Sequence, residues 1–267
     1  MVGISELFET VSQLARIEIR ITVSGIMLTL LLFGVFASAF NVQPVSSDWI
    51  WTRTIHIGAD GSVYPSDAPI STFDNITYTL TDSIVGNIPH MSNAIVVERD
   101  NIVLDGAGYT VQGAEIYRSN GINLTGRSNV TIKNMIITEF FFGIWLEYSN
   151  NNTIVANNII SNFAGIRLWY SSNNSIVENI FTDDGLEAFY SYGNLLEDNL
   201  VNGKPIIYLE GVAGVKINAT EPGQIILINC DNIQLENLNI SHTVVGIELW
   251  NTTNTKIIGN NITSNPL

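Results

Sequence analysis

The sequence has a single cysteine and few charged residues, and basic residues are scarcer still. Cys230 has no partner within the chain, which excludes an internal disulfide framework and a cysteine-rich zinc site, and we expect it to be a small buried hydrophobe. Charged residues make up 13% of the 267, and 11 basic against 25 acidic residues give a formal net charge of −14. Because nucleic-acid binding depends on a basic face, nucleic acid is not expected as a partner.

The first 40 residues contain one long uncharged apolar run, from Ile21 to Phe40. Arg16 and Arg20 precede this run and the small residues Ala37-Ser38-Ala39 end it, which is the pattern of a cleavable export signal. The run is also long enough to span a bilayer, so an uncleaved membrane anchor is the competing interpretation. Both interpretations place the rest of the chain outside the cytoplasm, either secreted or attached to the membrane by residues 1–40.

A repeat of about 22 residues runs through most of the remaining chain. It is marked by glycines spaced 22, 22 and 20 residues apart, at Gly121, Gly143, Gly165 and Gly185. Apolar residues alternate with polar ones after each glycine, which predicts short strands, and no convincing helical period follows residue 45. Short strands repeated without crossover helices favour a parallel β-solenoid in which each coil stacks on the last.

The predicted organisation has three parts: the leader at 1–40, capping strands at 41–91 and solenoid coils at 92–267, with one enlarged coil around 201–224. The last coil ends at Leu267 without a matching cap. We therefore expect the chain to be a fragment of a longer protein, and the alternative is that a partner covers this end.

Asparagine supplies much of the polar surface. One set recurs at coil spacing and is predicted to form a structural ladder of stacked side chains: Asn134, Asn157, Asn179, Asn199, Asn237 and Asn260. A second set begins Asn-x-Ser/Thr sequons, candidate glycosylation sites in an exported protein: Asn75, Asn123, Asn129, Asn151, Asn173, Asn218, Asn239, Asn251 and Asn261.

Several segments resemble the NosD-like family of right-handed parallel β-helix proteins, especially its archaeal cell-surface members. They include IGADGSVYPSDAPI at 57–70, IVVERDNIVLDGAGYTVQG at 95–113, GINLTGRSNVTIKNMII at 121–137 and GQIILINCDNIQLENLNISHTVVGIEL at 223–249. The resemblance covers nearly all of residues 57–267 and implies an all-β, right-handed parallel β-helix. It is weak for activity, because this fold hosts lyases, hydrolases, epimerases, adhesins and accessory proteins. One branch is implicated in periplasmic maturation of the copper site of nitrous oxide reductase, which implies a copper-handling accessory protein as one alternative.

Copper would require soft or imidazole ligands. The candidates show no chelating spacing within a strand: His56, His90, His242, Met91, Met135 and Cys230. Acidic columns could hold calcium, but nothing in the sequence supports either metal, and no cofactor is predicted. An enzyme acting on polysaccharide is the other alternative; its two carboxyl groups would need a defined separation. Adjacent Asp183 and Asp184 point to opposite faces of an extended segment and favour a polar turn, as do the charges of Glu98-Arg99-Asp100, so no catalytic residue is assigned.

Outward positions of the strand after each glycine carry large aromatic and charged residues. If the coils stack in register, they form one aromatic and acidic face: Trp145, Glu147, Arg167, Trp169, Glu187, Phe189, Tyr208, Glu248 and Trp250. Exposed aromatic rings beside hydrogen-bonding acids suit sugars. The sequence thus predicts a surface-associated protein that binds polysaccharide or a cell-envelope protein. The alternative for this face is that the missing chain or a neighbouring subunit covers it.

Overall fold

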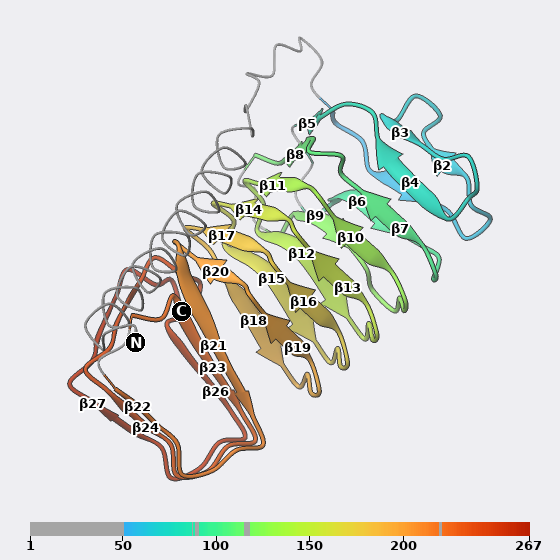
Figure 1. Ribbon diagram of the computed structural model, residues 1–267. Helices are drawn as coiled ribbons and strands as arrows, with labels where there is room; N and C mark the ends of the chain where they lie inside the picture. The colour runs from blue at the N-terminus through green and yellow to red at the C-terminus, as the bar shows by residue number, and fades with distance from the viewer. Residues whose placement is uncertain (1–50, 87, 89–90, 115–117, 219–220) are drawn as a thin grey trace, which may run out of the picture. The chain divides into compact units, whose positions relative to one another are not determined.

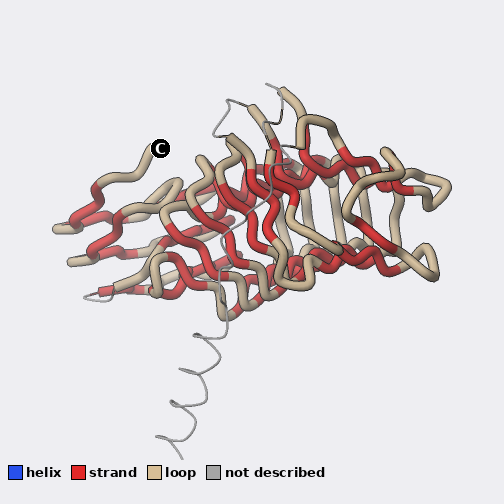
Figure 2. The backbone as a smooth tube through the Cα atoms, turned by 90° about the horizontal axis from the view of Figure 1, so that it is seen from above, coloured by secondary structure: helices blue, strands red, loops and turns tan. Residues whose placement is uncertain are grey.

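The computed structural model describes residues 51–267 apart from 87, 89–90, 115–117 and 219–220. Within these residues the chain forms short β-strands joined by turns, with no helix, as Figure 2 shows. In the same part of the chain, no helix is long and apolar enough to cross a membrane. The predicted signal or anchor at 1–40 lies outside the described residues, as does the beginning of the predicted cap.

Three sheets run along a first stack of coils, defined as residues 55–202, and most coils contribute one strand to each sheet (Figure 1). The first sheet contains β1 (Ile55–Ile57), β2 (Val63–Tyr64), β6 (Asn93–Val97), β9 (Asn120–Asn123), β12 (Phe142–Glu147), β15 (Ala164–Trp169) and β18 (Leu186–Phe189). The second contains β3 (Ile70–Ser71), β4 (Thr77–Leu80), β7 (Val103–Asp105), β10 (Thr131–Lys133), β13 (Thr153–Val155), β16 (Ser175–Val177) and β19 (Leu195–Glu197). The third begins with β5 (Ile84–Val85), β8 (Thr110–Gln112), β11 (Ile136–Thr138), β14 (Asn158–Ile160), β17 (Ile180–Thr182) and β20 (Leu200–Val201).

Apolar residues of successive coils lie in register inside this stack. Ile132, Ile154 and Ile176 pair from coil to coil in the second sheet and are fully buried. Alternate residues of each strand face outward, because successive side chains of a strand point to opposite faces. The fold is therefore a parallel β-solenoid with coils of about 22 residues, which confirms the predicted class.

The described part of the predicted cap itself forms a coil. Strands β1, β4 and β5 pair in parallel with β6, β7 and β8, while β2 and β3 add antiparallel pairs beside them. A capping role for residues 41–91 stays a prediction.

One asparagine column lies at the corner between the second and third sheets. Asn157 Nδ2 donates to Asn179 Oδ1 at 3.0 Å, and Asn179 Nδ2 donates to Asn199 Oδ1 at 3.0 Å. The same oxygens accept the backbone N–H of the residue one coil earlier, at 3.1 Å for Asn157 and 3.0 Å for Asn179. Buried turn amides are thus satisfied by side chains.

The structure corrects the placement of two predicted ladder residues. Asn134 and Asn237 have φ of 53° and place exposed side chains one position before the buried corner site, which Met135 and Leu238 fill. Each corner has two adjacent positions that suit asparagine. At the first the backbone is left-handed, and at the second the side-chain oxygen accepts a backbone N–H from the preceding coil. Asn260 does occupy the buried type of site, accepting the N–H of Leu238 at 2.8 Å.

Other corners carry columns that the sequence interpretation missed. Their members repeat at the spacing of the coils and hydrogen-bond from one coil to the next: Asn152, Asn174 and Asn194; Ser149, Ser171 and Ser191; and Asn162 with Asp184.

The chain reverses after β20, so the predicted enlarged coil is instead the start of a second stack, defined as residues 204–267. Strand β21 (Lys204–Glu210) pairs antiparallel with β20. The second stack contains three further sets of strands: β23 (Gln224–Ile228) and β26 (Ile247–Trp250) parallel to β21; β22 (Lys216–Asn218), β24 (Gln234–Glu236) and β27 (Lys256–Ile258); and β25 (Asn239–Ser241) with β28 (Asn261–Thr263).

Both faces of the sheet formed by β21, β23 and β26 pack against a hydrophobic core. Ile225 and Leu227 pack into the core of the second stack, whereas Ile226 and Ile228 belong to the core of the first. Two side chains hydrogen-bond the free edge of β18: Gln224 Oε1 accepts the Leu186 N–H at 3.0 Å, and Glu248 accepts the Ala188 N–H at 3.1 Å. The second stack therefore closes the end of the first.

Candidate functional site

The outward face of the first sheet brings together six of the nine residues predicted for a binding face. Strand pairing places them in two adjacent columns: Trp145, Arg167 and Glu187, then Glu147, Trp169 and Phe189. Trp145 and Trp169 are half-buried, so their rings contact other side chains while keeping part of their surface accessible.

Arg167 lies at the centre of these columns, surrounded by aromatic rings. Its Cζ is 4.9 Å from the ring centroid of Phe142, 5.6 Å from that of Trp145, 5.3 Å from that of Trp169 and 5.0 Å from that of Phe189. Rings at these distances attract a guanidinium through their negative faces and fix its position. The Arg167 side chain keeps 20% of its surface exposed.

Two carboxyl groups lie behind Arg167. Glu187 Oε2 is 3.1 Å from Arg167 Nη1, and the Glu187 side chain is fully buried. Burial raises the pKa of Glu187, although the Arg167 charge opposes this shift. Burial also raises the pKa of Glu248 to about 7, with the Ala188 N–H lowering it and the neighbouring Glu187 raising it.

The remaining three predicted residues come from the second stack and pack against the end of the first. Trp250 Nε1 donates to Tyr192 Oη at 3.0 Å, Tyr208 donates to Glu210 at 2.6 Å, and Glu248 contacts β18 as described above. Tyr208 and Trp250 also pack against the core of the first stack. The structure thus corrects the prediction of one continuous face, because the chain's own second stack covers part of it.

A hollow of about 510 Å³ opens beside the Arg167 cluster. We call it the Trp145 hollow, and its lining is Met91, Arg118, Asn120, Phe141, Phe142, Trp145 and Arg167. Only Trp145 and Arg167 of this set belong to the binding face predicted from the sequence, and Met91 was considered there only as a copper ligand. Phe141 and Phe142 immediately precede the repeat glycine Gly143, outside the two positions that the repeat pattern singled out, and the other residues come from earlier coils.

Stacked rings build one wall of the Trp145 hollow. Phe142 stacks on Trp145 with centroids 4.9 Å apart, and Phe141 stacks on Phe163 at 4.5 Å with 2° between the ring planes. Val244 and Val245 of the second stack join this apolar cluster. The wall is therefore held from both stacks.

A column of tyrosines lies at the end of the same strands and was also missed. Tyr148 and Tyr170 stack with centroids 5.2 Å apart, and Tyr170 and Tyr190 stack at 4.5 Å. The signal was present in the repeat, since a Tyr-Ser pair follows each of these three strands. The ring faces cover one another, so this column stabilises the stack and leaves few faces for a ligand.

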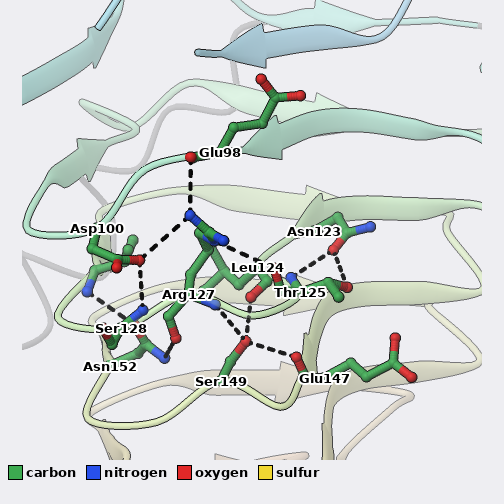
Figure 3. Close-up of polar contacts among 11 residues, drawn as sticks. Glu98, Asp100, Asn123, Leu124, Thr125, Arg127, Ser128, Glu147, Ser149 and Asn152 are labelled. Carbon is green, nitrogen blue, oxygen red and sulfur yellow. Dashed lines mark hydrogen bonds and ion pairs between the residues drawn. The ribbon is translucent and has the colours of Figure 1, made fainter. Parts of the chain in front are cut away.

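Glu98 and Asp100 of the segment 98–100 both contact Arg127 at a corner of the first stack (Figure 3). Arg127 Nη1 donates to the Glu98 carbonyl oxygen at 2.9 Å and lies 3.7 Å from Asp100 Oδ1. Asp100 Oδ1 also accepts the Ser128 N–H at 3.0 Å. These contacts fit the charged turn that the sequence predicts.

Asp183 and Asp184 occupy different environments. Asp184 Oδ2 accepts Asn162 Nδ2 at 2.7 Å in a buried corner, where desolvation raises the pKa of this carboxyl well above its ordinary value. Asp183 instead lines a smaller hollow of about 230 Å³ together with Lys204 and His242.

The candidate glycosylation sites lie at the surface. Eight of the nine sequon asparagines are exposed, and Asn123 is half-buried. Their glycosylation stays a prediction.

A family model described as "Periplasmic copper-binding protein (NosD)" matches residues 71–216 and 101–267. The chain belongs to the NosD family. The resemblance noted from the repeat segments is thereby confirmed, and the family is an extracytoplasmic one by its description. No curated protein and no solved structure gives a significant match.

The described copper-ligand candidates of this NosD-family protein have separate surroundings. Met135 and Cys230 are buried in the cores of different stacks, and His56 Nδ1 is paired with Glu98 Oε1 at 2.8 Å. Met91 lines the Trp145 hollow and His242 the smaller one; His90 lies outside the described residues. Across the part of the chain that the structure describes, no group of three or more His, Cys, Asp or Glu side chains could hold a metal ion.

Proposed function

We propose that this NosD-family protein is an extracytoplasmic binding protein that recognises carbohydrate in the Trp145 hollow. The observation that carries the proposal is the composition of the hollow, which combines aromatic rings with the polar side chains of Asn120, Arg118 and Arg167. Aromatic rings pack against the apolar faces of sugars, and amide and guanidinium groups bond their hydroxyls. A volume of about 510 Å³ is within the usual range for small-ligand sites.

The same composition favours binding over turnover. Hydrolysis of a glycosidic bond ordinarily needs two carboxyl groups flanking that bond. The described lining of the Trp145 hollow contains no carboxyl group, and Glu187 is buried behind Arg167. A polysaccharide hydrolase is therefore the weaker proposal for this surface.

The test is retention of the protein on immobilised cell-envelope polysaccharide. Trp145→Ala removes the ring that faces the hollow and should weaken retention at least about tenfold, as expected for loss of a stacking residue worth 1.4 kcal/mol or more. The control is Phe73→Ala, which removes a fully exposed ring that is not part of the hollow lining and should leave retention unchanged. Wild-type retention by Trp145→Ala, with its circular dichroism spectrum also unchanged, would contradict the proposal.

A copper-handling accessory role is the second candidate, and the family description supports it. Copper would then be cargo, held by surface donors such as His242 and by residues outside the described part of the chain. A copper titration should show stoichiometric binding that is lost when His56, His90 and His242 are replaced by alanine. Absence of stoichiometric binding to the wild-type chain would contradict this role.

A further inference from the structure

The Trp145 hollow differs in charge from the chain that contains it. The chain carries 25 acidic and 11 basic residues. Two of those basic residues, Arg118 and Arg167, line the hollow, and its described lining has no acidic residue. A negative ligand group would therefore meet guanidinium groups there, whereas the surrounding acidity would repel it elsewhere.

Arg167 is held ready to bind such a group. Four aromatic rings surround its guanidinium, and the buried Glu187 carboxylate lies 3.1 Å from Nη1. A guanidinium has five N–H donors in a planar fork, so one ion pair leaves others for a second carboxylate. Because the rings and Glu187 already fix the side chain, little conformational entropy is lost when a ligand binds.

Asn120 adds a fixed acceptor beside the two cations. Its Nδ2 donates to Asn93 Oδ1 at 2.7 Å, which sets the orientation of the amide. The Asn120 Oδ1 atom is then suited to accept a hydrogen bond from a ligand hydroxyl. The hollow thus combines aromatic surface, an acceptor for hydroxyls and donors for a carboxylate.

We infer that the ligand is an acidic carbohydrate, with uronate carboxylates bound by Arg118 and Arg167 and sugar rings packed against Trp145 and Phe142. This inference rests on the proposed function, since it names the class of sugar that the same hollow takes. Guanidinium groups match a planar carboxylate with two parallel N–H···O bonds, and such bonds are stronger than those between neutral groups.

The test compares two probes that differ only at their carboxyl groups: an oligomer of galacturonate and the same oligomer as its uncharged methyl ester. Calorimetric titration at low ionic strength should give the acidic oligomer at least about tenfold higher affinity, because charge-assisted hydrogen bonds are lost in the ester. Arg118→Gln should reduce this preference. Arg53→Gln is the matched control, since it changes a surface arginine that pairs with Asp67 away from the hollow, and it should leave the preference intact.

Arg167→Lys is the second variant, because it keeps a positive charge beside the buried Glu187 while removing the planar fork. It should keep the thermal melting temperature close to that of the wild type and lower affinity for the acidic oligomer more than for its ester. Equal affinity for both oligomers, lost in Trp145→Ala, would overturn the inference and leave the proposed function standing. Failure of acidic, esterified and neutral oligosaccharides alike to bind would overturn both.

Discussion

The two stacks use outward-facing positions of equivalent strands in opposite ways. In the first stack, Trp145 and Arg167 face outward and line an open hollow. In the second stack, Ile226 and Ile228 occupy the outward face of β23 and are fully buried in the core of the first. Trp169 and Trp250 occupy the same position in similar repeat segments. Trp250, however, packs at the junction, the region where the sheet of β21, β23 and β26 covers the end of the first stack. A side chain that points outward from a solenoid is therefore not always exposed to solvent. It is buried where another part of the chain covers that face of the strand.

The largest expected effect comes from a charge placed in the junction. Ile226→Asp puts a carboxylate where no partner is available and should lower the free energy of unfolding by about 4 kcal/mol or prevent folding. Val155→Asp changes a half-buried outward residue of β13 and should cost less than about 1 kcal/mol. Urea unfolding followed by circular dichroism compares the two, and equal losses would mean that the sheet of β21, β23 and β26 does not cover the first stack.

The corner positions allow a similar comparison between buried and exposed asparagines. Asn179→Ala leaves the Asn157 N–H and the Ile154 carbonyl without their side-chain partner, so it should cost about 3 kcal/mol. Asn134→Ala removes an exposed amide that donates to Asp105 Oδ1 and places alanine at a φ of 53°, so it should cost about 1 kcal/mol, clearly less than Asn179→Ala. The same urea measurement applies, and a larger loss for Asn134→Ala would refute the assignment of the two corner sites.

The junction should also make stability depend on pH. Burial raises the pKa of Glu248 from 4.5 to about 7, so the folded protein binds a proton that the unfolded chain has released. This group stabilises the fold fully below pH 4.5, and its contribution of about 3 kcal/mol should disappear as the pH rises through 7.

Glu248→Gln should flatten this dependence in thermal melts recorded between pH 5 and pH 8, whereas Glu147→Gln, on the outer face of the first stack, should leave it in place. A wild-type melting temperature that rises across this range would contradict the assignment. The buried Glu187 and Asp184, whose pKa values are also raised, should contribute with the same sign.

The smallest expected effect concerns the tyrosine column. Tyr170→Ala removes two ring contacts on the first stack and should lower the free energy of unfolding by about 1–2 kcal/mol. Tyr109→Ala is the control, because Tyr109 is exposed and lies outside this column. An unchanged free energy of unfolding for Tyr170→Ala would contradict a stabilising role for the stacked rings.

The sequence predicts the coils of the first stack because one repeat of about 22 residues determines strand, corner and core at once. The sequence also contains two indications that the chain reverses and packs back on the first stack, which the repeat pattern obscured. Asn202-Gly203 between apolar residues is a strong hairpin signal, and both residues have positive φ, of 50° and 75°. The five-residue segment Gln224–Ile228 has four consecutive apolar residues, as expected for a strand buried on both faces.

The candidate site is less accessible to sequence reasoning than the fold. Trp145 and Arg167 could be placed on an outward face because strand residues alternate. Met91, Arg118 and Asn120 reach the same hollow from earlier coils, and their side chains meet Trp145 only through tertiary packing. The ring contacts that fix Arg167 likewise depend on three different coils.

Hydrogen exchange with and without a bound acidic oligosaccharide tests the central claim most directly, because it locates the ligand on the chain. Binding in the Trp145 hollow predicts added protection in β9 and β12 and in the corner that precedes Phe142, with no change in β23. Protection confined to the second stack, or none at a saturating concentration of oligosaccharide, would contradict the account.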